Sequence, residues 1–256
     1  MRNPFHLVEA SPWPLFGALG AFVMAVGFID WFCCGSVFGL GLGLLLLIFV
    51  SFQWWRDVIR ESEMGCHGES VAKGIWVGFV LFIVSEACLF FSFFWAYFHS
   101  SLSPCLELGC VWPPVGVASI NPFKLPLLNT GVLIGSGVSV TWSHFAVLAG
   151  DRKEGLMGLF VTLVLGVYFL GLQAVEYMEC SFSFADSVFG SLFYLMTGFH
   201  GLHVLVGVLF LSVCFCRLYG YGFSSGRHLG FMAAVWYWHF VVVWVLLYLC
   251  VYWWGM

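Results

Sequence analysis

Seven polar side chains interrupt the long apolar stretches of this sequence, and they are its candidates for chemistry. These residues are Glu86, His99, His144, Glu176, His200, His203 and His239. An ionisable group inside a membrane is costly, so it usually binds another polar group, a ligand or an ion. His99 and His144 are expected near the membrane surfaces, where a histidine needs no special explanation. Each of the other five side chains needs a partner.

His200 and His203 are three residues apart, so a helix would place both on one face, where two imidazoles could ligate a metal. Haem ligands in a membrane cytochrome are instead expected on facing helices, and a di-iron bundle site needs several carboxylates in Glu-x-x-His spacing. Neither pattern is present, so we predict that His200 and His203 ligate no metal and instead make hydrogen bonds to other helices or to lipid. Four residues are expected to serve helix packing or a polar network: His200, His203, His239 and Glu176.

Glu86 is the most unusual of these residues, because it lies about 12 residues into an apolar stretch, or roughly 18 Å deep in a helix. An ionised carboxylate at this depth costs several kcal/mol unless it is paired. Its neighbours on the same helix face are apolar, which favours the neutral acid. Two interpretations stay open: a protonated glutamic acid bonded to a neighbouring helix, or a functional carboxylate linked to a ligand.

The composition shows what kind of element must position these residues. Of the 256 residues, 62% are hydrophobic and only 9% are charged, whereas soluble domains carry about 25% charged residues. The solvent of this chain must be mostly lipid. Its net charge of −4 argues against binding to nucleic acid, and its cysteines lie largely in apolar runs, where a thiol acts as a small hydrophobe.

The hydropathy pattern predicts an all-α integral membrane protein, because a span needs about 20 apolar residues. The expected spans are Trp13–Phe32, Ser36–Trp55, Gly74–His99, Leu125–Ala149, Gly155–Tyr177, Val188–Arg217 and His228–Trp254. Longer connections are expected over Arg56–Lys73 and Ser100–Lys124. No repeat of fixed period is visible, which argues against a transporter built from repeated halves.

The basic residues support this count and predict an orientation. With seven spans, one side of the membrane receives Arg2, Arg56, Arg60, Lys73, Arg152, Lys153, Arg217 and Arg227. The other side receives Lys124 alone. Because basic loops stay inside, the N-terminus is expected in the cytoplasm or mitochondrial matrix and the C-terminus on the opposite side.

Small residues recur every four positions in the first two spans, which predicts a tight helical hairpin. They are Gly17, Ala21 and Ala25 in the first span, and Gly35, Gly39 and Gly43 in the second.

An aromatic and basic cluster follows the second span, with Trp54, Trp55, Arg56 and Arg60 close together. Tryptophan favours the membrane interface and arginine can bind phosphate with two parallel hydrogen bonds. The cluster is either a belt of interfacial side chains or a specific lipid site. Arg217 is expected near the same membrane surface, whereas Arg152 is expected to be exposed.

Several motifs together resemble those of the cytochrome c oxidase subunit III family. The resemblance runs nearly end to end through Ser11-Pro12-Trp13-Pro14-Leu15, the run Trp54–Glu61, Trp112-Pro113-Pro114, Pro126–Thr130, the run Thr197–Val204 and Trp236–Phe240. It departs from the family at Trp76, Phe145 and Met232, where an arginine, a histidine and a glutamate are common, and it lacks an aspartate that usually follows Val241.

The resemblance implies one membrane domain over residues 1–256, with a two-helix arm (about 1–72), a five-helix bundle (about 73–256) and a lipid-filled cleft. It implies a chain without haem or copper that packs against oxidase subunit I, alongside subunit II and accessory subunits. That complex passes electrons from cytochrome c to oxygen and pumps protons in the mitochondrial inner membrane or a bacterial plasma membrane. A subunit of a quinol-oxidising relative and an independent haem-binding cytochrome are the alternatives.

The resemblance also implies particular site residues. Glu86 corresponds to a buried carboxylate of the family's third helix. Contacts to phospholipid headgroups are implied for a set of polar residues: Arg60, Glu61, His67, Arg217 and His228.

Overall fold

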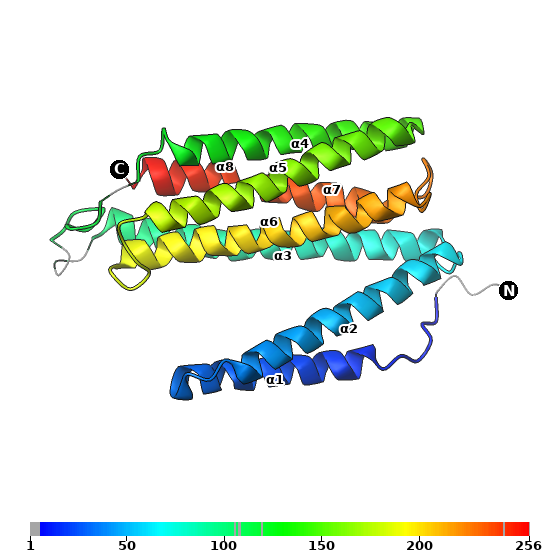
Figure 1. The fold of residues 1–256 in the computed structure, drawn as a ribbon, viewed down its shortest axis with the longest axis horizontal. Helices are drawn as coiled ribbons and strands as arrows, with labels where there is room; N and C mark the ends of the chain where they lie inside the picture. Colours follow the sequence, from blue (N-terminus) through cyan, green and yellow to red (C-terminus); the bar gives the residue numbers. More distant parts are fainter. Residues whose placement is uncertain (1–5, 105, 107–108, 119, 243, 256) are drawn as a thin grey trace. The chain divides into compact units, whose positions relative to one another are not determined.

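The computed structural model describes residues 6–104, 106, 109–118, 120–242 and 244–255. The regular elements of this part of the chain are helices (Figure 1). They are α1 (Trp13–Cys34), α2 (Phe38–Glu63), α3 (Glu69–Leu102), α4 (Leu125–Ala149), α5 (Arg152–Glu179), α6 (Val188–Tyr219), α7 (Leu229–Val242), α8 (Trp244–Leu247) and the π-helix η2 (Tyr248–Trp253).

Seven helical segments of the described residues are long and apolar enough to cross a membrane, with Leu229–Trp253 counted as the seventh. The all-α, seven-span prediction is confirmed. The bounds predicted for the fourth span, Leu125–Ala149, are those of α4.

The long polar loop predicted over Arg56–Lys73 is wrong. α2 continues to Glu63 and α3 begins at Glu69, which leaves a short connection between them. The physical reason is that a helix need not end where lipid ends. Arginine and glutamate are good helix formers, and water or headgroups can solvate their side chains.

The chain divides into two compact units, Met1–Ile75 and Trp76–Met256, with the boundary inside α3. In the first unit α1 and α2 pack against each other as a hairpin. Gly35 closes α1 in a left-handed conformation (φ 72°) that favours glycine.

The predicted tight hairpin is confirmed, but part of its predicted contact face is wrong. A Cβ atom on Gly27 would lie 2.2 Å from the Leu40 backbone nitrogen, and one on Gly43 would lie 2.5 Å from the Met24 nitrogen. Gly20 and Gly27 are buried, whereas Ala21 and Ala25 are exposed. The four-residue repeat therefore identified the helix pair but not the contact face of α1, where the buried glycines are seven residues apart.

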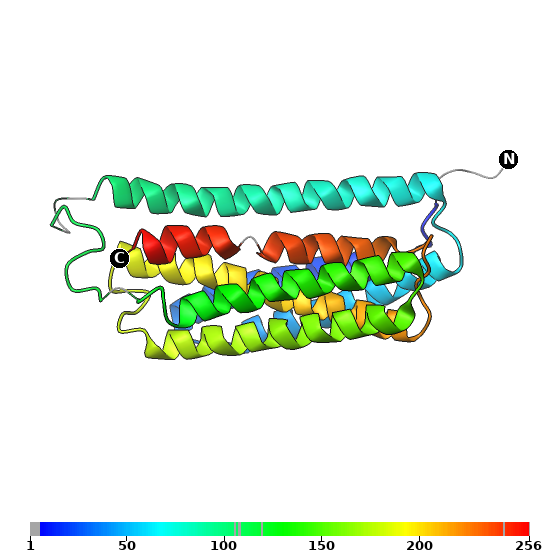
Figure 2. The ribbon, with the colours of Figure 1, turned by 90° about the horizontal axis from the view of Figure 1, so that it is seen from above.

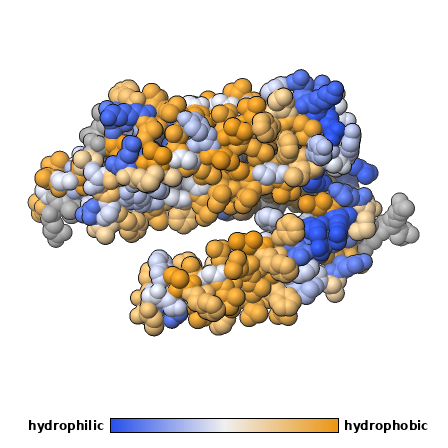
Figure 3. Space-filling view, in the orientation of Figure 1, coloured by the Kyte–Doolittle hydropathy of each residue, from blue (hydrophilic) through white to orange (hydrophobic). Residues whose placement is uncertain are grey.

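In the second unit α4, α5, α6 and α7 pack in succession, and α4 also packs against α7 (Figure 2). Their core is rich in aromatic side chains, including Phe169, Phe193, Phe231 and Trp238. α3 contacts α7 and α6 through aromatic rings. Trp76 packs edge-on against Trp236 of α7, with ring centroids 5.1 Å apart, and the ring centroids of Phe93 and Phe199 of α6 are 5.2 Å apart. Apolar residues cover much of each unit's visible surface between hydrophilic patches (Figure 3).

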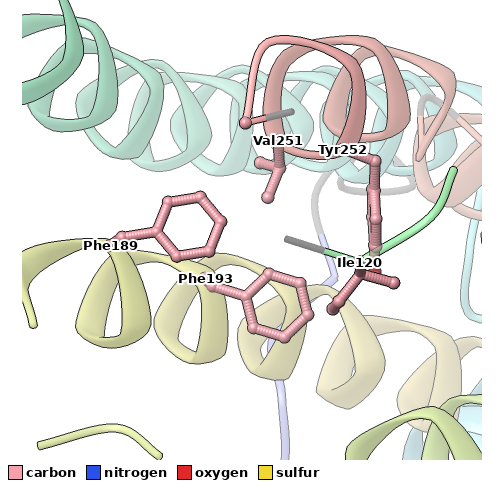
Figure 4. A pocket seen from close by; sticks show the side chains of 6 residues that line it. Ile120, Phe189, Phe193, Val251 and Tyr252 are labelled. Carbon is pink, nitrogen blue, oxygen red and sulfur yellow. The ribbon is translucent and has the colours of Figure 1, made fainter. Parts of the chain in front are cut away.

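Near its C-terminal end the bundle contains a small apolar space lined by Phe189 and Phe193 of α6, Val251 and Tyr252 of η2, and Ile120 (Figure 4). No water molecule fits within this space. These side chains form packed core and offer no ligand cavity.

Candidate functional site

The principal candidate site is a carboxyl–imidazole pair inside the second unit. Glu86 projects from α3 and His203 from α6, and the Glu86 Oε2 and His203 Nε2 atoms are 2.7 Å apart. The two side chains are 20% and 10% exposed. Of the two interpretations left open for Glu86, the structure provides the hydrogen bond to a neighbouring helix that the first required.

The hydrogen bonds of His203 indicate which ring nitrogen carries a proton. The other ring nitrogen, Nδ1, lies 2.6 Å from the Phe199 carbonyl oxygen. A carbonyl oxygen only accepts hydrogen bonds, so Nδ1 carries a proton and donates. One further proton is then shared between Nε2 and Glu86: either the neutral acid donates to the imidazole, or the imidazolium donates to the carboxylate.

The surroundings of the pair are aromatic. Three ring centroids lie close to the centroid of the His203 ring. That of Phe90 is 5.2 Å away, and those of the stacked Tyr237 ring and of the Phe240 ring are each 6.3 Å away. The Glu86–His203 hydrogen bond therefore lies among aromatic rings, where a polar group without a partner would be costly.

The other predicted network residues each bond to another helix. His200 Nε2 donates to the Val241 carbonyl oxygen of α7 at 2.9 Å. His239 Nε2 is 3.2 Å from the Thr141 hydroxyl of α4. The buried Glu176 of α5 accepts a hydrogen bond from the Tyr252 hydroxyl of η2.

Several buried polar residues that join helices were not predicted from the sequence. The Ser139 hydroxyl of α4 and the Thr162 hydroxyl of α5 are 2.7 Å apart, and Trp238 Nε1 donates to the Ser136 hydroxyl at 3.0 Å. Asn129 of α4 is fully buried. An amide or hydroxyl inside a predicted span was the available signal, but hydroxyls can satisfy themselves on their own helix.

The aromatic and basic cluster of the first unit is organised by Asp57, a residue for which the sequence predicted no role. Trp13 Nε1 donates to Asp57 Oδ2 at 2.7 Å, and Arg56 Nη2 donates to Oδ1 at 3.0 Å. Arg60 is 63% exposed, with its Nη1 atom 3.9 Å from Oδ1. Trp55 is also largely exposed. Arg60 therefore keeps more of its guanidinium available to a phosphate than Arg56 does.

Glu61 and His67 lie beside a third residue, His6, in the same unit. The His6 Nε2 and Glu61 Oε2 atoms are 3.2 Å apart, and the His6 and His67 ring centroids are 5.8 Å apart. Burial lowers the pKa of the His67 imidazole, and the nearby His6 ring lowers it further. Sequence spacing did not indicate this cluster.

Arg217 and His228 lie in the second unit, around the connection between α6 and α7. The Arg217 guanidinium lies over the Phe223 ring at 4.3 Å, and His228 Nδ1 donates to the Ser224 carbonyl oxygen at 3.2 Å. Arg152, which we expected to be exposed, is half-buried. It donates to the Leu218 carbonyl oxygen at 3.0 Å and also to that of Tyr219. That expectation is wrong because an arginine can satisfy the free carbonyls at the end of a neighbouring helix.

The family model for cytochrome c oxidase subunit III matches residues 3–256. The chain belongs to the cytochrome c oxidase subunit III family. It is 56% identical to cytochrome c oxidase subunit 3 of Pisaster ochraceus over 256 residues, covering 99% of this chain and 98% of the relative. It is 54% identical to the protein of that name from Heterololigo bleekeri over 257 residues, covering 100% and 99%. The resemblance read from the motifs is confirmed.

Proposed function

We propose that this chain is the non-redox subunit III of a mitochondrial cytochrome c oxidase. The observation that carries the proposal is the end-to-end family match, together with about half of all residues shared with animal relatives of that name. Seven apolar helices and animal relatives fit the mitochondrial inner membrane. The family name favours cytochrome c over quinol as the electron donor of the complex.

The chain's role in this proposal is to support a catalytic subunit that carries the haem and copper. His203 uses both ring nitrogens within the protein, which argues against its serving as a haem ligand. The apolar side chains exposed on the helices supply surface for the haem-bearing subunit I and for lipid. The basic bias of the loops supports an N-terminus in the matrix and a C-terminus in the intermembrane space.

Glu86 and His203 are proposed to help sustain proton uptake by the complex. The two side chains share one proton, and transfer of that proton between them leaves the net charge of the pair at zero. Electron transfer is proposed to take place in the partner subunits.

The proposal is tested by isolating the chain with and without its partners. Purified from its native membrane in mild detergent, it should bring with it a larger haem-bearing membrane subunit, whereas the chain expressed alone should be colourless in visible light. A stoichiometric haem spectrum from the isolated chain would favour the independent cytochrome and refute the non-redox assignment.

Phospholipid binding is proposed for the exposed Trp55 and Arg60 in the first unit and for Arg217 in the second. Arg60→Ala and Arg217→Ala should each lower the amount of tightly bound phospholipid, measured by mass spectrometry of lipids retained after delipidation. Arg227→Ala is the matched control, since Arg227 is an arginine of the connection between α6 and α7 that is not among the proposed phospholipid contacts. Equal phospholipid retention in all three variants would refute a specific lipid site and would mean that these side chains form only an interfacial belt.

A further inference from the structure

His6, Glu61 and His67, which come from three different segments, bring their ligand atoms together in the first unit. His6 precedes α1, Glu61 lies in the last turn of α2, and His67 lies in the connection to α3. One ligand atom from each lies within 4.8 Å of the other two. His6 and Glu61 are mostly shielded, with side chains 16% and 21% exposed. Helical periodicity cannot produce this meeting, because each residue comes from a different segment.

We propose that His6, Glu61 and His67 form a binding site for a divalent late transition metal ion of the zinc type. Two imidazoles and a carboxylate are a donor set suited to Zn²⁺, whereas Mg²⁺ and Ca²⁺ prefer oxygen ligands throughout. The single carboxylate offsets part of the charge of a dication.

The geometry needs only local adjustment to hold such an ion. Zn²⁺ bonds of about 2.0–2.1 Å in a tetrahedron place ligand atoms about 3.4 Å apart. His6 Nε2 and Glu61 Oε2 are already 3.2 Å apart. One ring nitrogen of His67 lies within 4.8 Å of a ligand atom of each of the other two residues, so it needs to approach them by up to about 1.4 Å to reach the ligand spacing of a tetrahedral Zn²⁺ site. A water molecule completes the fourth position.

The ion would tie the segment before α1 to the connection between α2 and α3. This site competes with the phospholipid contact implied for Glu61 and His67, since both would use the same polar atoms. The site does not depend on the function proposed above. Its test therefore uses the isolated chain, which lacks the metals of an oxidase complex.

The test uses the untagged full chain, purified in phospholipid-free detergent and stripped with a chelator. Zn²⁺ binding is measured by equilibrium dialysis with elemental analysis, and Co²⁺ is added separately as a spectroscopic substitute. We expect one Zn²⁺ per chain and the intense visible bands of four-coordinate Co²⁺. His6→Ala, His67→Ala and Glu61→Gln should each weaken Zn²⁺ binding by more than about 100-fold, since losing an outer-shell partner alone costs 10–100-fold.

His99→Ala is the control, because His99 is an exposed histidine at the other end of α3, and it should bind Zn²⁺ like the unmodified chain. Glu61→Gln preserves shape, so it reports ligand loss even where an alanine variant loses helicity by circular dichroism. Absent Zn²⁺ binding, or equal binding by the unmodified chain and Glu61→Gln, overturns the site. Loss of phospholipid retention in these variants without any Zn²⁺ binding also overturns it, and assigns the cluster to a lipid headgroup.

Discussion

The α1–α2 hairpin and the bundle formed by α4 to α7 are both apolar, yet their helices are held together by different means. The buried residues of the hairpin helices are Gly20 and Gly27 in α1 and Gly43 and Val50 in α2. The buried residues of the bundle include many polar side chains, among them Ser136, Thr162, Gln173 and His200.

This difference follows from what lipid can and cannot do. Lipid tails are as apolar as leucine, so hydrophobicity does not drive one spanning helix against another. The remaining forces are van der Waals contact, which grows when backbones approach, and hydrogen bonds between helices. The hairpin relies mainly on backbone approach. The bundle also has close approaches, such as that of Gly158 in α5 to the Ser143 backbone of α4, and adds hydrogen bonds between helices and interlocking aromatic rings.

The largest effect is expected from adding a methyl group between the backbones of the hairpin. Gly27→Ala puts a Cβ atom 2.2 Å from the Leu40 nitrogen, and this atom belongs to backbone that cannot rotate away. The variant should lose about 3 kcal/mol or more of unfolding free energy, because a clash with backbone lies at or above the top of the usual range for overpacking. The measurement is unfolding in mixed micelles with increasing denaturing detergent.

Gly41→Ala is the control for this substitution, because a Cβ atom on Gly41 meets nothing within 4 Å. Alanine favours the helix by up to about 1 kcal/mol over glycine, so this control should be neutral or stabilising. Equal destabilisation of the two variants would refute the claim that backbone approach holds the hairpin.

An intermediate effect is expected in the bundle when Glu86 loses its polar group. Glu86→Leu leaves His203 Nε2 without its partner and should cost about 1–3 kcal/mol of unfolding free energy. Glu86→Gln keeps the shape and a hydrogen bond, so stability, assembly and oxygen consumption should change little. If the oxidase assembles with Glu86→Gln but loses nearly all oxygen reduction, Glu86 belongs to an essential proton path.

The smallest effect is expected from one hydrogen bond between helices. A double-mutant cycle of Ser139→Ala and Thr162→Val should give a coupling of about 0.6 kcal/mol in unfolding free energy, a typical value in membrane bundles. Ser92→Ala is the control, since that hydroxyl bonds to the backbone of its own helix. A coupling near zero would mean that the other α4–α5 contacts, such as the Ser143 hydroxyl donating to the Gly155 carbonyl oxygen, hold these helices together without this bond.

The sequence by itself determined the number of spans, the pairing of α1 with α2, and the family. These features depend on properties of neighbouring residues: the length of an apolar run, the recurrence of small residues, and ordered motifs. The bounds of α4 were predictable because a polar connection and proline precede it and glycine follows it. The end of α2 at Glu63 was not predictable, because hydropathy locates the edge of the lipid rather than the end of a helix.

Only the tertiary structure decided which polar groups meet. Glu86 and His203 are separated by 117 residues, and His6 and Glu61 by 55. The same holds for Arg152, whose carbonyl partners lie at the end of α6. Hydropathy and periodicity give the face and depth of a side chain on its own helix. Which side chain faces it from another segment depends on the rotation, offset and crossing of packed helices, and these are set by the fit of many side chains at once.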